Sequence, residues 1–234
     1  GTPQGGPLSP LLSNIMLNEL DNELERRGLP FVRYADDSMI FCKSKRAAMR
    51  VKESITRFIE KTLYLKVNKE KTVVSYVRGV KYLGYSFYVM KGKCELTVHP
   101  KSKAKMKTRL KELTSRSNGW GYAKRKQKLK EYIRGWVGYY HLANMKRLLL
   151  VTDEWLRRRI RMCIWKAWKK AKTKVANLII CGINKYHAYE WGNTRKGYWR
   201  IADSPILKRA IDNNKLRSAG YATLMEAYLE WYPK

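Results

Sequence analysis

Two adjacent carboxylates lie between two short apolar segments near the start of the chain, and this feature constrains the fold most. Phe31–Tyr34 and Ser38–Phe41 are rich in aromatic and aliphatic residues, and Ala35-Asp36-Asp37 separates them. Short apolar runs joined by a tight polar turn are typical of a β-hairpin. The pattern predicts that Asp36 and Asp37 lie at the tip of a hairpin whose strands fix their position.

Helical and strand patterns alternate through the rest of the first 98 residues. Ser9-Pro10 is typical of an N-cap followed by proline in the first turn, and apolar residues then recur at helical spacing up to Arg27-Gly28. The same periodicity predicts a second helix over residues 48–63. Short strands are predicted over residues 72–76, 82–89 and 96–98. This order predicts an α+β layer of helices packed on an antiparallel sheet.

The charge balance changes near residue 98. Residues 1–98 hold 17 basic and 10 acidic residues, a formal charge of +7, whereas residues 99–234 hold 33 and 9, a charge of +24. In the second part, apolar periodicity interrupted by glycines predicts a mainly α-helical region. Its expected helices span about 101–116, 122–141, 148–178, 205–214 and 222–231. Domain boundaries are expected near His99-Pro100 and near Gly182, which divides the chain into residues 1–98, 99–181 and 182–234.

Composition narrows the class of protein. The net charge is +31, from 50 basic and 19 acidic residues, and 44% of the residues are hydrophobic. A chain this apolar is not a disordered basic tail, so we expect a folded protein that binds a polyanion. No apolar run approaches the ~20 residues of a membrane span, and no membrane association is expected. The cysteines lack metal-ligand spacing, which predicts a reduced, intracellular protein; they are Cys42, Cys94, Cys163 and Cys181.

The aspartate pair suits phosphoryl transfer. Mg²⁺ is bound by one or two carboxylates together with substrate phosphates, and two such ions stabilise both the attacking and the leaving oxygen. The alternative for Asp36-Asp37 is an ordinary acidic turn. The loop Gly1–Pro10 precedes a predicted helix, so its backbone can approach a phosphate closely, and Gln4 offers a donor and an acceptor there. The alternative for that loop is a purely structural helix entry.

Four motifs in order resemble the palm of reverse transcriptases, and specifically the group II intron reverse transcriptase and maturase family. They are PQGGPLSPLLSNIMLNELD at residues 3–21, RYADD at 33–37, LKVNKEKT at 65–72 and KYLGYSF at 81–87. The resemblance implies a right-hand polymerase fold, with an α+β palm portion followed by a helical thumb and C-terminal region. It also implies RNA-directed DNA polymerase activity with Mg²⁺ as cofactor.

The resemblance assigns roles to particular residues. Asp36 and Asp37 would be the catalytic metal ligands, and Lys71 would act near the leaving pyrophosphate, where a cation stabilises developing charge; for Lys71 the alternative is an ordinary solvated lysine. The residues that would line the nucleotide and template site are Gln4, Gly5, Tyr34 and Ala35. The loop that would grip the primer is Tyr82, Leu83, Gly84 and Tyr85, where Gly84 would let the backbone approach a nucleic-acid strand.

The second part extends the resemblance. Residues 118–140 resemble the maturase-specific thumb, and residues 186–232 resemble the short DNA-binding region of bacterial members. We expect the tryptophans of the predicted helix 148–178 (Trp155, Trp165 and Trp168) to be core residues. Its many basic residues predict a nucleic-acid-binding surface. The candidates for that surface are Arg134, Arg157, Arg158, Arg159, Arg161, Lys166, Lys169, Lys170, Arg195 and Lys196.

The resemblance also predicts parts that this sequence lacks. The family uses a third carboxylate on a strand before the glycine loop and, earlier still, fingers that hold the template. The abrupt start without Met suggests a fragment, a processed product or one half of a split protein. The implied partners are intron RNA, a DNA primer and target, dNTPs and an N-terminal fingers-palm segment, in the bacterial cytoplasm. The alternatives are a non-enzymatic maturase fragment and a CRISPR-associated or diversity-generating reverse transcriptase.

Overall fold

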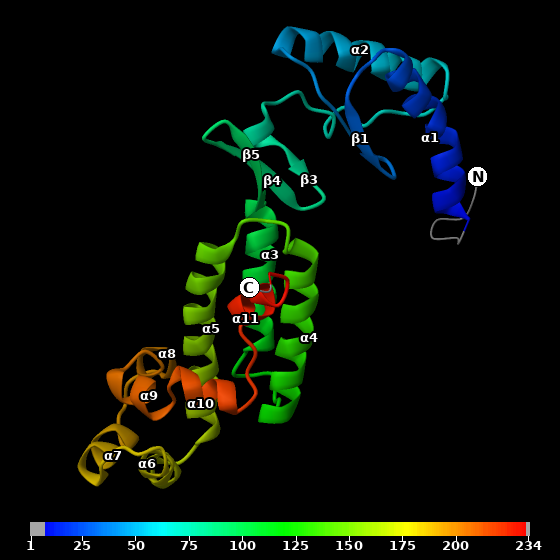
Figure 1. The fold of residues 1–234 in the computed structure, drawn as a ribbon. Helices are drawn as coiled ribbons and strands as arrows, with labels where there is room; N and C mark the ends of the chain where they lie inside the picture. Colours follow the sequence, from blue (N-terminus) through cyan, green and yellow to red (C-terminus); the bar gives the residue numbers. More distant parts are fainter. Residues whose placement is uncertain (1–7, 233–234) are drawn as a thin grey trace. The chain divides into compact units, whose positions relative to one another are not determined.

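The computed structural model describes residues 8–232 and divides into two compact units between Tyr82 and Leu83 (Figure 1). The glycine loop with Gln4 and Gly5 lies outside the described residues. The division falls earlier than the boundary expected near His99-Pro100. It is a division by packing, and the assignment of three functional domains stays a prediction.

The first unit contains the predicted hairpin between two helices. Its elements are α1 (Ser9–Arg26), β1 (Phe31–Tyr34), β2 (Asp37–Ile40) and α2 (Lys45–Lys61). Helix α1 begins at Ser9, with Leu8 in the N-cap position, one residue earlier than the expected cap. The core of this unit is small and joins the two helices through Leu20, Leu24, Ile55 and Leu63.

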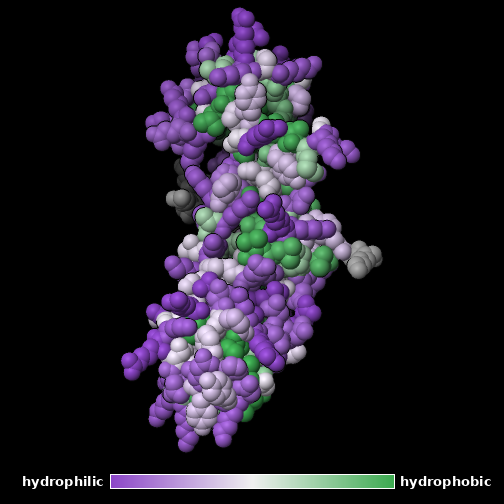
Figure 2. All heavy atoms as spheres, turned by 90° about the vertical axis from the view of Figure 1, so that its left-hand side faces the viewer, coloured by the Kyte–Doolittle hydropathy of each residue, from purple (hydrophilic) through white to green (hydrophobic). Residues whose placement is uncertain are grey.

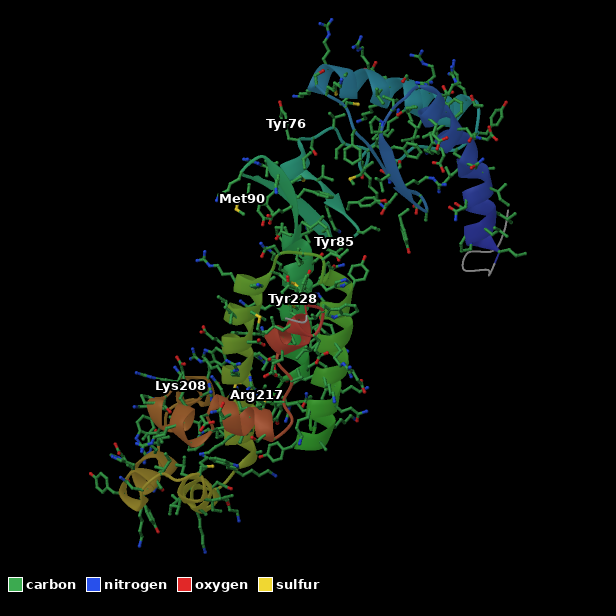
Figure 3. All side chains as sticks on the ribbon, viewed as in Figure 1. Tyr76, Tyr85, Met90, Lys208, Arg217 and Tyr228 are labelled. Carbon is green, nitrogen blue, oxygen red and sulfur yellow. The ribbon has the colours of Figure 1, made fainter. Side chains whose placement is uncertain are left out.

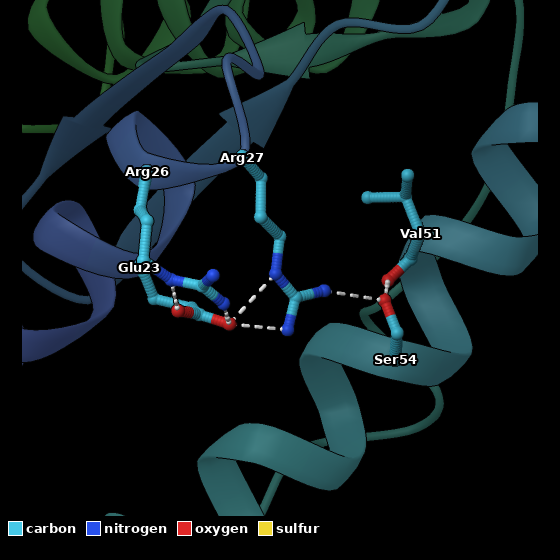
Figure 4. A network of polar contacts seen from close by, with 5 residues as sticks. All are labelled: Glu23, Arg26, Arg27, Val51 and Ser54. Atoms are coloured by element: carbon cyan, nitrogen blue, oxygen red, sulfur yellow. Dashed lines mark hydrogen bonds and ion pairs between the residues drawn. The ribbon is translucent and has the colours of Figure 1, made fainter.

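A polar network also joins α1 to α2 (Figure 4). Glu23 accepts hydrogen bonds from Nε of Arg26 at 2.8 Å and from Nε of Arg27 at 2.7 Å. Nη1 of Arg27 donates to Oγ of Ser54 at 2.9 Å, and that hydroxyl donates to the carbonyl of Val51 at 3.1 Å. The hydrogen bonds from Arg26 and Arg27 lower the pKa of Glu23 to about 2.

The prediction of a strand over residues 72–76 is wrong. This segment runs without a ladder partner among residues 8–232 and leads into the 3-10 turn η1 (Val77–Gly79). Val73 is 71% exposed, and Tyr76, labelled in Figure 3, is 81% exposed, so neither side chain packs against a core. A strand needs a partner for its backbone groups, and here the segment is tied down by Nζ of Lys52, which donates to the carbonyl of Thr72 at 2.6 Å.

The structure has two small antiparallel sheets where one sheet was expected. The hairpin β1-β2 forms the first. The second has the order β3 (Lys81–Tyr82), β4 (Tyr85–Met90), β5 (Lys93–Val98), so the predicted strand 82–89 is interrupted at Leu83-Gly84. A two-residue turn, Lys91-Gly92, joins β4 to β5. Both of its φ angles are positive, 50° and 77°, which matches the twist of a tight hairpin.

Three long helices and a short C-terminal one build the main part of the second unit (Figure 1). They are α3 (Pro100–Leu113), α4 (Tyr122–Tyr140), α5 (Lys146–Ala167) and α11 (Leu224–Leu229). Helix α3 contacts α4 and α5, and α11 contacts both α4 and α5. The side chains buried among them come from all the long helices: Met106, Leu110, Leu129, Ile133, Leu149, Leu156, Ile160 and Trp165. The predicted helices 101–116, 122–141 and 222–231 are confirmed.

Two predicted helices are each divided in the structure. The expected helix 148–178 becomes α5 and α6 (Ala171–Ile180), because the chain turns at Trp168, whose ring packs 5.7 Å from that of Trp165. Both tryptophans are buried, as predicted, and Trp155 is half-buried against the same core. The expected helix 205–214 becomes α9 (Pro205–Ala210) and α10 (Asn213–Ser218), because Asp212 caps a new helix. Two short helices were not predicted: α7 (Lys185–Gly192) and α8 (Tyr198–Ile201).

A buried carboxylate fixes the C-terminal helix. Asp153 on α5 is 2% exposed and accepts hydrogen bonds from the backbone N–H groups of Leu224 and Met225, each at 2.9 Å. These groups belong to the first turn of α11, which has no carbonyl partners of its own for them. Burial raises the pKa of Asp153. Sequence reasoning had not identified this residue.

Candidate catalytic turn and nucleic-acid surface

The hairpin holds the two aspartates at different positions. Tyr34 pairs with Asp37 across the ladder, so Ala35 and Asp36 form a two-residue loop and Asp37 is the first residue of β2. Ala35 has a φ of 53°, a left-handed conformation that costs a residue with a Cβ about 1–2 kcal/mol. Both carboxylates are exposed, and Tyr34 is 64% exposed. The tight loop therefore presents neighbouring carboxylates on a fixed backbone.

Arg33 holds this turn against helix α1. Its Nε lies 2.8 Å and 3.0 Å from the two carboxylate oxygens of Asp21, and its Nη1 donates to Oδ1 of Asn14 at 2.9 Å. The same Nη1 donates to the carbonyl of Ala35 at 3.0 Å. The hydrogen bond to Asp21 raises the pKa of Arg33. The sequence analysis did not identify Asp21 and Asn14 as partners of Arg33. The only signal in the sequence was their seven-residue spacing, which puts both on one face of the predicted helix.

Tyr82 completes the surroundings of the turn within the first unit. Burial raises the pKa of Tyr82, and the charge of Asp37 raises it further, while Arg33 acts in the opposite sense. Its hydroxyl is buried and has no hydrogen-bond partner among the described residues. Tyr82 was predicted to grip the primer, and the structure brings it into the electrostatic surroundings of the aspartate turn.

The Ala35-Asp36-Asp37 turn offers part of the ligand set of a magnesium ion. Two exposed carboxylates on adjacent residues match a site in which Mg²⁺ takes one or two protein ligands and completes its shell with water and phosphate oxygens. No group of three or more His, Cys, Asp or Glu side chains that could hold a metal occurs within residues 8–232. The described residues thus offer Asp36 and Asp37 alone as ligands at this position.

Lys71 lies in a separate loop. Oδ1 of Asn68 accepts hydrogen bonds from the backbone N–H groups of Glu70 and Lys71, both at 3.1 Å, and the Thr72 hydroxyl donates to the carbonyl of Asn68 at 2.8 Å. These bonds fix the backbone of the loop and leave the Lys71 side chain exposed. Its predicted role near a leaving pyrophosphate stays a prediction.

The loop Leu83-Gly84-Tyr85 is bound to helices α3 and α4. The carbonyl of Gly84 accepts hydrogen bonds from the backbone N–H of His99 and from Oγ of Ser102, both at 3.0 Å. The Tyr139 hydroxyl donates to the carbonyl of Leu83 at 3.0 Å. The ring of Tyr85, labelled in Figure 3, lies 6.1 Å from that of Tyr139, and burial among tyrosines raises its pKa to about 12.

Gly84 does make room for a close approach, but a protein side chain takes that room. A Cβ at Gly84 would collide with Oη of Tyr140 and lie 3.2 Å from Oγ of Ser102. The room left by the missing side chain of Gly84 is therefore taken by Tyr140, and the approach of this backbone to a nucleic-acid strand stays a prediction. Tyr140 also packs 4.7 Å from Trp136, ring to ring.

Four of the side chains predicted to bind nucleic acid contact other groups of this chain. Arg161 is 6% exposed and donates to the carbonyl of Ile211 at 2.8 Å. Arg159 donates to Oγ1 of Thr114 at 2.6 Å, and Arg158 lies over the ring of Trp199 at 3.9 Å. Nζ of Lys166 donates to the carbonyl of Arg116 at 2.7 Å. Arg161 therefore joins α5 to the C-terminal region instead of facing a phosphate.

Other predicted contacts remain on the surface. The exposed ones are Arg134, Lys169, Lys170, Arg195 and Lys196, whereas Arg157 is half-buried. The second unit holds 35 basic and 10 acidic residues, a formal charge of +25. Figure 2 shows hydrophilic side chains over most of the face it presents, with smaller apolar patches between them. Such a surface attracts a polyanion, and the attraction weakens as salt is added.

Two family models match the chain in order. The reverse transcriptase (RNA-dependent DNA polymerase) model matches residues 1–87, and the group II intron, maturase-specific domain model matches residues 103–189. The first match covers the aspartate turn and the Leu83-Gly84-Tyr85 loop. The second covers α4, α5 and α6 together with most of α3 and α7.

The chain is similar to three groups of curated proteins. Protein YkfC of Escherichia coli (strain K12) is 32% identical, with 36% of this chain and 32% of the relative covered. The group II intron-encoded protein LtrA of Lactococcus lactis subsp. cremoris is 28% identical, with 38% of this chain and 26% of the relative covered. The retron Ec86 reverse transcriptase of Escherichia coli is 32% identical, with 31% of this chain and 24% of the relative covered. The matches span about a third or less of each relative's length.

Proposed function

Because the chain belongs to the group II intron reverse transcriptase and maturase family, we propose that it is part of an RNA-directed DNA polymerase that also binds intron RNA. The observation that carries the proposal is the order of the two family matches, the first of which contains a hairpin that presents Asp36 and Asp37 on a fixed turn. The maturase-specific match favours this family over retron, CRISPR-associated or diversity-generating reverse transcriptases.

In this proposal Asp36 and Asp37 hold Mg²⁺, and a third carboxylate comes from a segment outside this sequence. Bound there, the metal would supply the charge that activates the primer hydroxyl and stabilises the leaving pyrophosphate. Arg33 positions the turn by bonding the carbonyl of Ala35 and the carboxylate of Asp21. The Leu83-Gly84-Tyr85 loop, held on α3 and α4, would contact the primer.

The second unit provides the proposed nucleic-acid binding. Its formal charge of +25 and its maturase-specific match favour intron RNA as one ligand, with a DNA primer and target as others. Within residues 8–232, every helix is too short or too polar to cross a membrane. Because of its maturase-specific match, we further propose that the protein acts bound to intron RNA and its DNA target, in the bacterial cytoplasm.

The test is Mg²⁺-dependent extension of a DNA primer on an RNA template. The full chain is assayed alone and with an added N-terminal fingers-palm fragment from a related enzyme, and we expect extension only with the fragment. Asp36→Ala and Asp37→Ala should each abolish extension, whereas Ser38→Ala, an exposed change on the same strand, should retain it. Affinity for intron RNA should stay within several-fold in all three variants.

The possible results separate the candidate functions. Extension that survives Asp36→Ala would contradict the metal-ligand assignment. No extension in either mixture, with intron RNA binding intact, would favour a non-enzymatic maturase. Loss of both extension and RNA binding in Asp36→Ala would contradict the division of work between the two units.

A further inference from the structure

Helices α6 and α7 form a tight pair with a buried side and an exposed side. Gly192 of α7 lies so close to Val175 of α6 that a Cβ there would collide with it. Leu178 and Ala188 are fully buried at the same contact. Close packing of this kind fixes the direction in which the other side of α7 points.

The exposed side of α7 carries two tyrosines. Tyr186 is 75% exposed and Tyr189 is 53% exposed, although tyrosine rings in a folded protein usually bury most of their apolar surface. Residues three apart on a helix lie on one face, so the two rings are neighbours. Together with Lys185 and Glu190 they line an open depression of about 710 Å³.

The charge of the segment that holds this face favours a polyanion as its ligand. Residues 169–200 hold eight basic residues and one acidic residue. The basic residues are Lys169, Lys170, Lys172, Lys174, Lys185, Arg195, Lys196 and Arg200. The acidic one is Glu190, whose Oε2 lies 3.0 Å from Nδ1 of His187. Phosphates would therefore lie toward Lys185 and away from Glu190.

We propose that Tyr186 and Tyr189 form a stacking platform for unpaired nucleobases of a single-stranded nucleic acid. Exposed aromatic rings next to lysines bind single strands, because every unpaired base presents a flat face and every linkage carries a phosphate. A duplex hides those faces in its own stack, so the platform selects single-stranded segments. The inference rests on the nucleic-acid binding proposed above and specifies what this part of the surface recognises.

The test compares single strands with duplexes on the full chain. Fluorescence anisotropy is measured with short single-stranded RNA and DNA oligonucleotides and with a duplex of the same sequence. Tyr186→Ala/Tyr189→Ala should weaken single-strand binding about tenfold or more, since both stacking rings are lost, and should change duplex binding less than about twofold. Tyr186→Phe/Tyr189→Phe, which keeps both rings, should bind as the unmodified chain does.

A matched control and a direct probe accompany these variants. Tyr64 is 88% exposed and lies in the first unit, so Tyr64→Ala should leave single-strand binding unchanged. An oligonucleotide carrying 5-iodouracil should crosslink to a peptide that contains Tyr186 or Tyr189. Comparison of the RNA and DNA arms shows which kind of single strand the platform prefers.

Three results would overturn the proposal. Unchanged single-strand binding by Tyr186→Ala/Tyr189→Ala would mean that these rings do not stack on bases, and a protein partner would become the candidate ligand of this face. Equal losses on single strands and duplexes would mean that the tyrosines do not read unpaired bases. If the unmodified chain bound neither form of nucleic acid, the proposed function would fail together with this inference, whereas the first two results leave the proposed function standing.

Discussion

Gly84 shows how much a single residue can decide in the second unit. Its φ of +83° lies in the left-handed region, its absent side chain admits Tyr140, and its carbonyl accepts two hydrogen bonds. The sequence identified Gly84 as a point of close approach, because it lies in the motif KYLGYSF and has no side chain to keep a neighbour away. It did not identify the partner, since Tyr140 lies on a helix 56 residues further along the chain.

Replacing Gly84 by alanine should destabilise the second unit. Gly84→Ala should lower the free energy of unfolding by about 1–3 kcal/mol more than Gly92→Ala, because both glycines have positive φ but only Gly84 has a neighbour in the way of a Cβ. Urea unfolding followed by tryptophan fluorescence measures this unit alone, since all eight tryptophans lie after residue 82.

A second substitution tests the cause. Tyr140→Phe removes the hydroxyl that a Cβ at Gly84 would meet, so it should recover part of the stability lost in Gly84→Ala. Equal losses in Gly84→Ala and Gly92→Ala would mean that backbone strain alone explains the effect.

At the scale of elements, local patterns predicted the hairpin and the long helices but not their ends. The hairpin was predictable because its strands and turn lie within ten residues. The end of α5 at Ala167 was not, because Trp168 is buried in the core of the second unit and the chain turns there, and helical periodicity does not reveal such tertiary burial. The basic residues of α5 were predicted to face nucleic acid, but a sequence does not tell which arginines donate to the protein's own carbonyls.

The contact between α1 and α2 should depend on pH through Glu23. Its pKa is about 2 in the folded chain and 4.5 ordinarily, so its ion pairs stabilise the first unit fully above pH 4.5 and are lost as the pH falls through 2. Protection of α1 against hydrogen–deuterium exchange, corrected for the intrinsic exchange rate, should decline over this range. The decline should be smaller in Glu23→Gln.

Glu25→Gln is the matched control on the same helix, since Glu25 is exposed. It should preserve the pH dependence of the unmodified chain. The same pH dependence in Glu23→Gln and in the unmodified chain would exclude Glu23 as its source.

At the scale of the whole molecule, charge predicted a polyanion partner but not which side chains reach it. Among the candidates, Lys169 and Lys170 are exposed, whereas Arg161 is buried and donates to the carbonyl of Ile211. Net charge is a sum over the chain and carries no information on burial. The division into two units between Tyr82 and Leu83 was also hidden from charge counting, since it depends on which elements pack together.

Salt dependence of RNA binding should separate exposed from buried cations. Lys169→Gln/Lys170→Gln should reduce the slope of log affinity against log salt by about 1.4 to 1.8, because each lost phosphate contact contributes about 0.7 to 0.9. Arg161→Met should leave the slope unchanged and lower the free energy of unfolding of the second unit. A slope that falls in Arg161→Met while stability is retained would place Arg161 on the binding surface.

The carbonyl of Gly84 has a consequence for how the proposed polymerase would distinguish deoxyribose from ribose. A carbonyl oxygen has two lone pairs, and His99 and Ser102 occupy both. This oxygen therefore has no remaining capacity to accept a hydrogen bond from a ribose 2′-hydroxyl. If the loop lies along a primer strand, any preference for deoxyribose over ribose there has to come from steric contact or from other atoms.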